Sequence, residues 1–144
     1  MTLSRVTMIT LGVRDLAVST AFYRAVFGQQ PNPEYTGVAF FELPGAWLAL
    51  YPLDKLADDI GPGVVVPVRG FNGTTLAYNA RRRGDVDAIF RELETAGARI
   101  AKPPQETFWG GYSGYFADPD DYYWEVAWGP MFDFTPDGSL RFTA

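Results

Sequence analysis

Histidine and cysteine are both absent from the 144 residues of this chain. They are the residues that most often bind zinc, copper and other borderline or soft transition metals. Without cysteine there are no disulfides and no thiol nucleophiles, and without histidine the commonest general base is missing. The chain also has no glycine-rich phosphate loop.

Charge and hydropathy narrow the range of partners. The net charge of −5 disfavours nucleic acid and makes a neutral or cationic ligand easier to hold. No apolar run approaches the length of a bilayer span, and the N-terminal residues lack the apolar core of a signal peptide. We therefore expect a cytoplasmic protein with no membrane partner. The length predicts one domain, or two small halves sharing a core.

The first predicted helix runs from about Leu16 to Phe27. Asp15 precedes it as an N-cap, and Gly28 follows as its C-terminal stop. Residues at spacings of four form its expected apolar stripe: Val18, Phe22 and Val26.

A second helix is predicted from Asp85 to Ala96, and Gly97 ends it. Its expected buried stripe consists of Val86, Ile89, Phe90 and Leu93. The preceding Arg81-Arg82-Arg83 triplet is interpreted as a solvated turn, because three adjacent charges cannot all face one site.

Strands are predicted where apolar residues alternate or gather between turn signals. They are Val6–Val13, Gly37–Leu43, Ala46–Tyr51, Thr74–Ala80, Tyr112–Ala117 and Tyr122–Trp128. Pro44-Gly45 predicts a hairpin turn in the first half, and an Asp-Pro-Asp turn at Asp118 does so in the second. Residues 54–73 are expected to be loop.

The order of elements occurs twice, which indicates an internal duplication. Met8–Val13 overlays Thr75–Ala80, and Phe40–Ala49 runs without a gap against Phe116–Glu125. One such half cannot cover both faces of its sheet. Pairing two halves is therefore expected to enclose a shared cleft.

Three segments in this order resemble the vicinal-oxygen-chelate superfamily, the glyoxalase, bleomycin-resistance and extradiol-dioxygenase group. They are Leu11–Asp15 leading into Ala21–Tyr23, the 85–97 helix, and Phe116–Asp120 before Trp124–Val126. The resemblance implies an α+β fold of two tandem βαβββ modules that form an open, curled mixed sheet around a cleft, often completed in a homodimer. The expected divisions are module one at about 5–52, a linker at 53–72, module two at 73–130 and a C-terminal tail at 131–144.

The resemblance also locates the four metal-ligand positions of metal-dependent members. In this sequence they hold Met8, Ala49, Thr75 and Glu125. Only Glu125 offers a carboxylate to a hard cation, Met8 suits soft copper, and Ala49 has no ligand atom. We therefore expect no metal and no other cofactor. The turn departs from the family as well, because Asp121 occupies its usual glycine position.

Period-two alternation predicts which side chains face the cleft. Its expected walls are mostly aromatic, with a few small polar groups and one carboxylate, which is typical of a small-molecule pocket. The predicted ligand-binding residues are Met8, Trp47, Tyr51, Thr75, Asn79, Phe108, Trp109, Tyr115, Tyr123 and Glu125, and Thr10, Ala49, Ala77 and Ala127 share these faces. The alternative is that these side chains fill the concave face as a second core.

Two of these features allow more than one interpretation. Glu125 is either a general acid or base, the partner of a cationic ligand, or a leftover carboxylate bonded to Thr75, Asn79 or a tyrosine hydroxyl. Phe108 and Trp109 precede a double glycine and form either a lid over a ligand or a rigid cap.

Three functions compete. The first is a non-catalytic protein that binds a small aromatic or cationic molecule, in the manner of bleomycin-resistance proteins. The second is a lyase, isomerase or dioxygenase-type enzyme that uses Glu125 with a metal or as acid and base. The third is a structural dimer with a filled cleft. The broken metal quartet favours the first.

Overall fold

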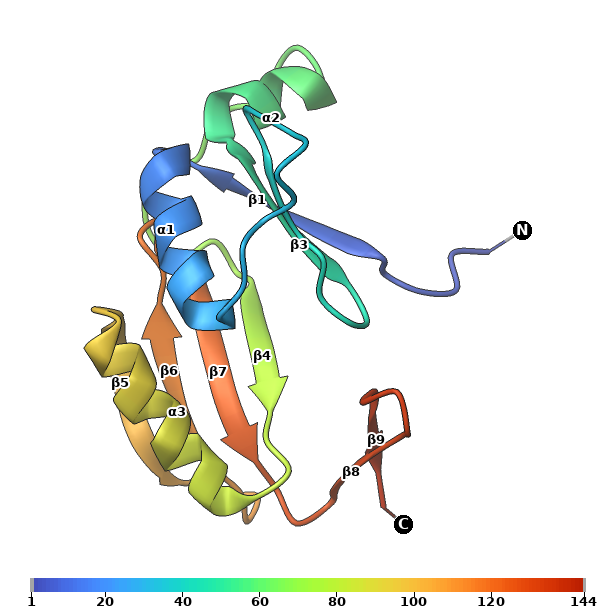
Figure 1. The fold of residues 1–144 in the computed structure, drawn as a ribbon, viewed down its shortest axis with the longest axis vertical. Helices are drawn as coiled ribbons and strands as arrows, with labels where there is room; N and C mark the ends of the chain where they lie inside the picture. Colours follow the sequence, from blue (N-terminus) through green and yellow to red (C-terminus); the bar gives the residue numbers. More distant parts are fainter. Residues whose placement is uncertain (1, 144) are drawn as a thin grey trace. The chain divides into compact units, whose positions relative to one another are not determined.

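The computed structural model describes residues 2–143, which form two structural units divided between Val68 and Arg69. Each unit carries an open, mixed sheet with a helix against it (Figure 1). The fold is α+β, as predicted from the sequence. In this part of the chain no helix has the length and apolar character needed to cross a bilayer.

The first unit contains three strands and two helices. They are β1 (Met8–Val13), α1 (Leu16–Phe27), β2 (Ala39–Phe41), β3 (Trp47–Pro52) and α2 (Leu53–Ile60). Sheet A has the order β1-β3-β2, with β1 parallel and β2 antiparallel to β3. The predicted hairpin of the first half is confirmed.

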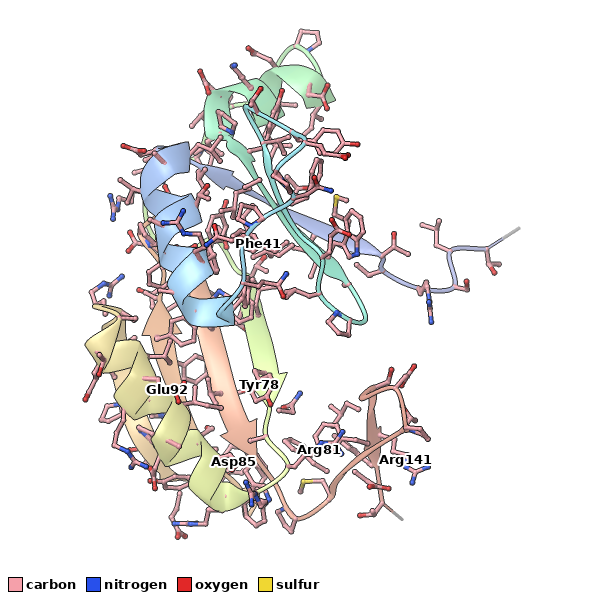
Figure 2. All side chains as sticks on the ribbon, in the orientation of Figure 1. Phe41, Tyr78, Arg81, Asp85, Glu92 and Arg141 are labelled. Carbon is pink, nitrogen blue, oxygen red and sulfur yellow. The ribbon has the colours of Figure 1, made fainter. Side chains whose placement is uncertain are left out.

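Helix α1 begins and ends where the sequence predicts. The Asp15 carboxylate accepts the N–H of Val18 at 3.1 Å, and Gly28 ends the helix with φ +65°. Its buried side packs Tyr23 and Phe27 against Phe41 of β2, which is labelled in Figure 2. The predicted stripe is wrong at Val18, which is 51% exposed, because the face turned to the sheet centres on Tyr23 and the small Ser19.

Two expectations for the first unit are wrong. Helix α2 lies within residues predicted to be loop, and it buries Ala57 while Asp58 and Asp59 remain exposed. The short strand expected before the hairpin is not formed between α1 and β2, because Pro31 and Pro33 have no N–H to donate to a ladder.

The second unit has the complete βαβββ order. It consists of β4 (Thr75–Asn79), α3 (Arg83–Thr95), β5 (Arg99–Glu106), β6 (Tyr112–Ala117) and β7 (Tyr123–Trp128). Sheet B has the order β4-β7-β6-β5, and α3 lies across one of its faces (Figure 1). The predicted α3 stripe is confirmed at Val86, Phe90 and Leu93, which are buried, whereas Ile89 is only half-buried.

Strand pairing confirms the internal duplication. In sheet A the parallel register aligns Met8 with Trp47, and in sheet B it aligns Thr75 with Tyr123. The predicted overlay matches Met8 with Thr75 and Trp47 with Tyr123, so the two pairs are equivalent.

The hairpin overlay is wrong by one residue. Leu48 pairs with Phe41, and its equivalent Trp124 pairs with Phe116, so Phe41 rather than Phe40 corresponds to Phe116. The second turn contains one more residue and includes Asp121 at φ +64°.

The predicted tail folds into a hairpin of β8 (Phe132–Phe134) and β9 (Leu140–Phe142). The Arg81–Arg83 triplet is exposed, as expected, but its members are not free of contacts. Arg81 lies over the ring of Phe134 in the hairpin at 4.6 Å, and Figure 2 shows it between β4 and the tail. Arg82 pairs with Asp85 at 2.9 Å.

Candidate functional site

Within the described residues of the second unit, α3 covers one face of sheet B and no helix covers the other. Gly114 marks the covered side, because an added Cβ would come within 2.6 Å of Cζ of Phe90 in α3. Side chains alternate between faces, so residues of the opposite phase lie on the other side, which we call the open face of sheet B. The register assigns these predicted residues to it: Thr75, Ala77, Asn79, Tyr115, Tyr123 and Glu125.

Glu125 and Tyr115 are direct partners across the β6–β7 ladder. The Tyr115 phenol therefore neighbours the Glu125 carboxylate on the open face. Burial raises the pKa of the Tyr115 phenol, and the nearby Glu125 carboxylate raises it further. Of the three partners that the sequence allowed for Glu125, a tyrosine is the neighbour that the strand register supplies. A neutral phenol beside a half-buried carboxylate can present both a donor and an acceptor.

The first unit contributes the remaining predicted side chains. Met8 and Trp47 are aligned on the side of sheet A opposite to Leu11 and the α1 core, and they are 40% and 38% exposed. Tyr51 lies on this same side and is half-buried. A surface depression on α1, lined by Arg24 and Gln30 among others, contains none of the predicted residues.

Sequence reasoning missed two aromatic residues beside Trp47. Phe40 lies 6.3 Å from Trp47 between ring centroids, and Tyr35 lies 5.3 Å from Phe40. Phe40 pairs with Ala49, so it shares the side of sheet A that carries Trp47. The one-residue error in the hairpin overlay concealed this position, although the aromatic run Phe40-Phe41 was a usable signal.

Helix α2 covers the end of this same side of sheet A at Gly12. A Cβ added to Gly12 would lie 2.5 Å from Cδ1 and 3.3 Å from Cα of Leu53. The close approach favours glycine, since an alanine would force the Leu53 side chain to shift and the backbone of α2 to give way by a few tenths of an ångström. Helix α2 therefore limits the uncovered part of sheet A to the end near Met8 and Trp47.

Phe108 and Trp109 lie in the turn between β5 and β6. Trp109 packs against Phe132 of the tail at 5.9 Å and close to the backbone of Gly129. Phe108 projects fully into solvent. The packing of Trp109 favours the interpretation of this turn as a cap, and the role of Phe108 as part of a lid stays a prediction.

A model of the Glyoxalase/Bleomycin resistance protein/Dioxygenase superfamily matches residues 5–126. The chain belongs to this superfamily. Among its superfamily relatives, the metallothiol transferase FosB of Shouchella clausii is 31% identical over 126 residues, covering 85% of this chain and 79% of the relative. The FosB of Lysinibacillus sphaericus is 27% identical over 133 residues, covering 92% and 88%.

Solved structures of the superfamily agree with the fold. A glyoxalase-related enzyme from Fulvimarina pelagi superposes with a TM-score of 0.86 and 35% identity, covering 99% of this chain and 100% of that one. The fosfomycin resistance protein FosX from Listeria monocytogenes superposes with a TM-score of 0.69 and 24% identity, covering 90% and 97%, and this likeness concerns the fold alone.

The FosB relatives are named metallothiol transferases, so the possible metal ligands of this chain bear on its function. The register makes Met8 equivalent to Thr75, and Ala49 equivalent to Glu125, as the family pattern requires. Among these four positions only Glu125 carries a carboxylate, its cross-strand partner is Tyr115, and Thr75 offers no more than a neutral hydroxyl. Within residues 2–143, no three His, Cys, Asp or Glu side chains are grouped to hold a metal ion. This donor set does not fit a hard or borderline divalent cation.

Proposed function

We propose that this chain is a small-molecule-binding member of the superfamily whose ligand carries a positive charge or N–H donors next to an aromatic ring. The observation that carries the proposal is the cross-strand pair of Tyr115 and Glu125 on the open face of sheet B. A carboxylate has two oxygens and several lone pairs, so one phenol does not exhaust its capacity to accept hydrogen bonds.

Aromatic rings near this carboxylate suit the same ligand class. Tyr123 stands two positions before Glu125 on the same strand and face. Ring faces attract cations by about 0.5–2 kcal/mol, and a nearby carboxylate adds to the attraction. The net charge of −5 acts in the same direction over longer distances.

Sheet A has an aromatic side of its own, where Met8 and Trp47 stand at register positions equivalent to Thr75 and Tyr123. A homodimer in the cytoplasm, as the family resemblance implies, belongs to the proposal.

An acid–base enzyme is the second candidate, and the Tyr115–Glu125 pair also favours it. The raised pKa keeps the Tyr115 phenol protonated at neutral pH, so it could act as proton donor while Glu125 accepts. The metallothiol transfer named for the FosB relatives is less well supported, because three of the four ligand positions here offer no hard donor.

Tryptophan fluorescence tests the binding proposal. The panel contains cationic glycopeptides, the planar aromatic cation proflavine, and fosfomycin as an anionic comparison. We expect the cations to quench emission, Glu125→Gln to weaken their binding, and Trp47→Phe to reduce the signal. Wild-type affinity in Glu125→Gln would contradict the assignment, and no response to any compound would favour the filled-cleft alternative.

Native mass spectrometry separates the competing functions. The expected spectrum is a dimer without stoichiometric metal. One equivalent of transition metal, lost in Glu125→Ala, would overturn the proposal in favour of a metal-dependent enzyme. A thiol-transfer assay with added divalent metal provides the matching activity measurement.

A further inference from the structure

Asp121 has an unusual backbone conformation for its residue type. Its φ of +64° is the only positive value at a non-glycine position among residues 2–143. Glycine adopts this left-handed region freely, whereas a residue with a Cβ adopts it at a cost that aspartate tolerates better than most. Strained positions of this kind persist where surrounding contacts hold them, and they gather at functional sites.

The Asp121 carboxylate supplies such contacts by joining two arginines. Its Oδ2 lies 2.9 Å from Nε of Arg69, and its Oδ1 lies 2.5 Å from a terminal nitrogen of Arg99. Arg69 also donates to the carbonyl of Pro119 at 2.6 Å. The carboxylate is only 17% exposed. We call Arg69, Asp121 and Arg99 the arginine clamp.

The turn that carries Asp121 is itself firmly bonded. The buried Asp118 carboxylate accepts the backbone N–H groups of Asp120 and Tyr122 at 2.8 and 2.9 Å. The backbone N–H of Asp121 donates to the Asp118 carbonyl at 3.2 Å. The turn therefore offers the two arginines a fixed anchor, and the Asp121 side chain is not needed to close it.

Arg99 and Phe71, which follows Arg69 by two residues, both contact the ring of Tyr123 on the open face of sheet B. The Arg99 guanidinium lies 5.8 Å from the centre of the Tyr123 ring. Phe71, two residues after Arg69, meets the same ring edge-on at 6.0 Å between centroids. The Phe71 ring is otherwise 66% exposed, so most of its surface is free for another contact.

We propose that Asp121 is a positioning residue whose clamp holds Phe71 on the open face of sheet B, where Phe71 forms the outer wall of the ligand site at Glu125. Phe71 belongs to a glycine-flanked stretch, Gly70 to Gly73, with no strand or helix of its own. Without an anchor this stretch would be free to leave the sheet. The ligand part rests on the proposed function, whereas the anchoring part does not.

Limited trypsin digestion tests the anchoring directly. Arg69 must enter the protease pocket for cleavage before Gly70, and the clamp occupies its guanidinium. Losing charged hydrogen bonds from Asp121→Asn or Asp121→Gly should speed this cleavage by about tenfold or more. Cleavage after the exposed Arg5 in the same digest is the internal control. An unchanged ratio of the two rates would overturn the clamp.

Proflavine titration tests whether the anchored Phe71 contributes to ligand binding. Asp121→Gly relieves the backbone strain but also removes both ion pairs, so the two effects oppose each other and we expect little change in melting temperature together with weaker proflavine binding. Phe71→Ala should weaken binding to a similar degree, and the double variant should be no weaker than either single one.

The outcomes of the two assays are distinguishable. Faster cleavage with wild-type proflavine affinity in Asp121→Gly would overturn the role of Phe71 as a ligand wall. If proflavine and the other cations fail to bind the wild type, the proposed function and this ligand role fall together, and the digestion ratio still decides the clamp.

Discussion

Tyr115 and Glu125 face each other as direct partners across the β6–β7 ladder, and the pKa of the Tyr115 phenol is raised by burial and by the Glu125 carboxylate. Glu125 occupies a position where metal-dependent relatives are expected to carry a ligand. A half-buried carboxylate needs polar neighbours, and the tyrosine opposite it is one. The pair therefore places a neutral proton donor beside a carboxylate.

The phenol of Tyr115 should titrate above the ordinary tyrosine value of 10.0, because burial and the Glu125 charge both disfavour the phenolate. A pKa raised by folding contributes stability that is complete below the unfolded value and is lost as the pH rises through the folded one. Phenolate absorbance of the wild type minus that of Tyr115→Phe isolates this group. Glu125→Gln should move the difference curve to lower pH, and an unmoved curve would contradict the pairing.

Acid should weaken the arginine clamp. The hydrogen bond from Arg69, with the charges of Arg69 and Arg99, holds the pKa of Asp121 below its ordinary value of 3.8. A lowered pKa contributes stability that is complete above 3.8 and is lost as the pH falls through the folded value. Urea unfolding across this range should show a smaller loss in Asp121→Asn than in the wild type. Equal acid dependence in both proteins would argue against the ion pairs.

Gly12→Ala should destabilise the first unit, because its Cβ would collide with Leu53 of α2. Overpacking of this kind costs about 1–3 kcal/mol in the free energy of unfolding, measured by urea denaturation. Gly84→Ala is the matched control, since nothing lies within 4 Å of its added Cβ and it stands inside α3. That control should stabilise by about 0.5–1 kcal/mol. The same sign for both variants would refute the close approach of α2.

Asp15→Ala should remove the N-cap of α1 and cost about 1 kcal/mol of stability in the same measurement. Asp59→Ala provides the comparison, because this exposed carboxylate lies in the last turn of α2, where a negative charge is unfavourable. It should leave stability unchanged or slightly higher. A loss at Asp59 equal to that at Asp15 would show that neither effect comes from capping.

Local signals were sufficient for much of the fold. Asp15 and Gly28 set the ends of α1, because capping groups act within one helical turn. The duplication could also be read from the repeated order of elements, and the register agrees with it by aligning Met8 with Trp47 and Thr75 with Tyr123. The same overlay identified Glu125 as the sole carboxylate among the four metal-ligand positions.

Tertiary contacts decided what local patterns do not encode. Helix α2 is short and lacks a side-chain N-cap, so it depends on the surface at Gly12 that no nearby residue reveals. Val18 fits the helical period yet remains exposed, because the sheet meets the neighbouring face of α1. Periodicity indicates which side a residue faces but not what lies against that side.

The sequence by itself determined which family the chain resembles and which residues stand at that family's metal-ligand positions, because these follow from residue identity and order. Only the tertiary structure decided that Glu125 is paired with Tyr115 and that Asp121 holds two arginines near Tyr123. The partner of a strand residue depends on the length and backbone conformation of the turn. In the second hairpin, one additional residue and the left-handed Asp121 set the register. Neither feature can be predicted from the alternation of hydrophobic residues.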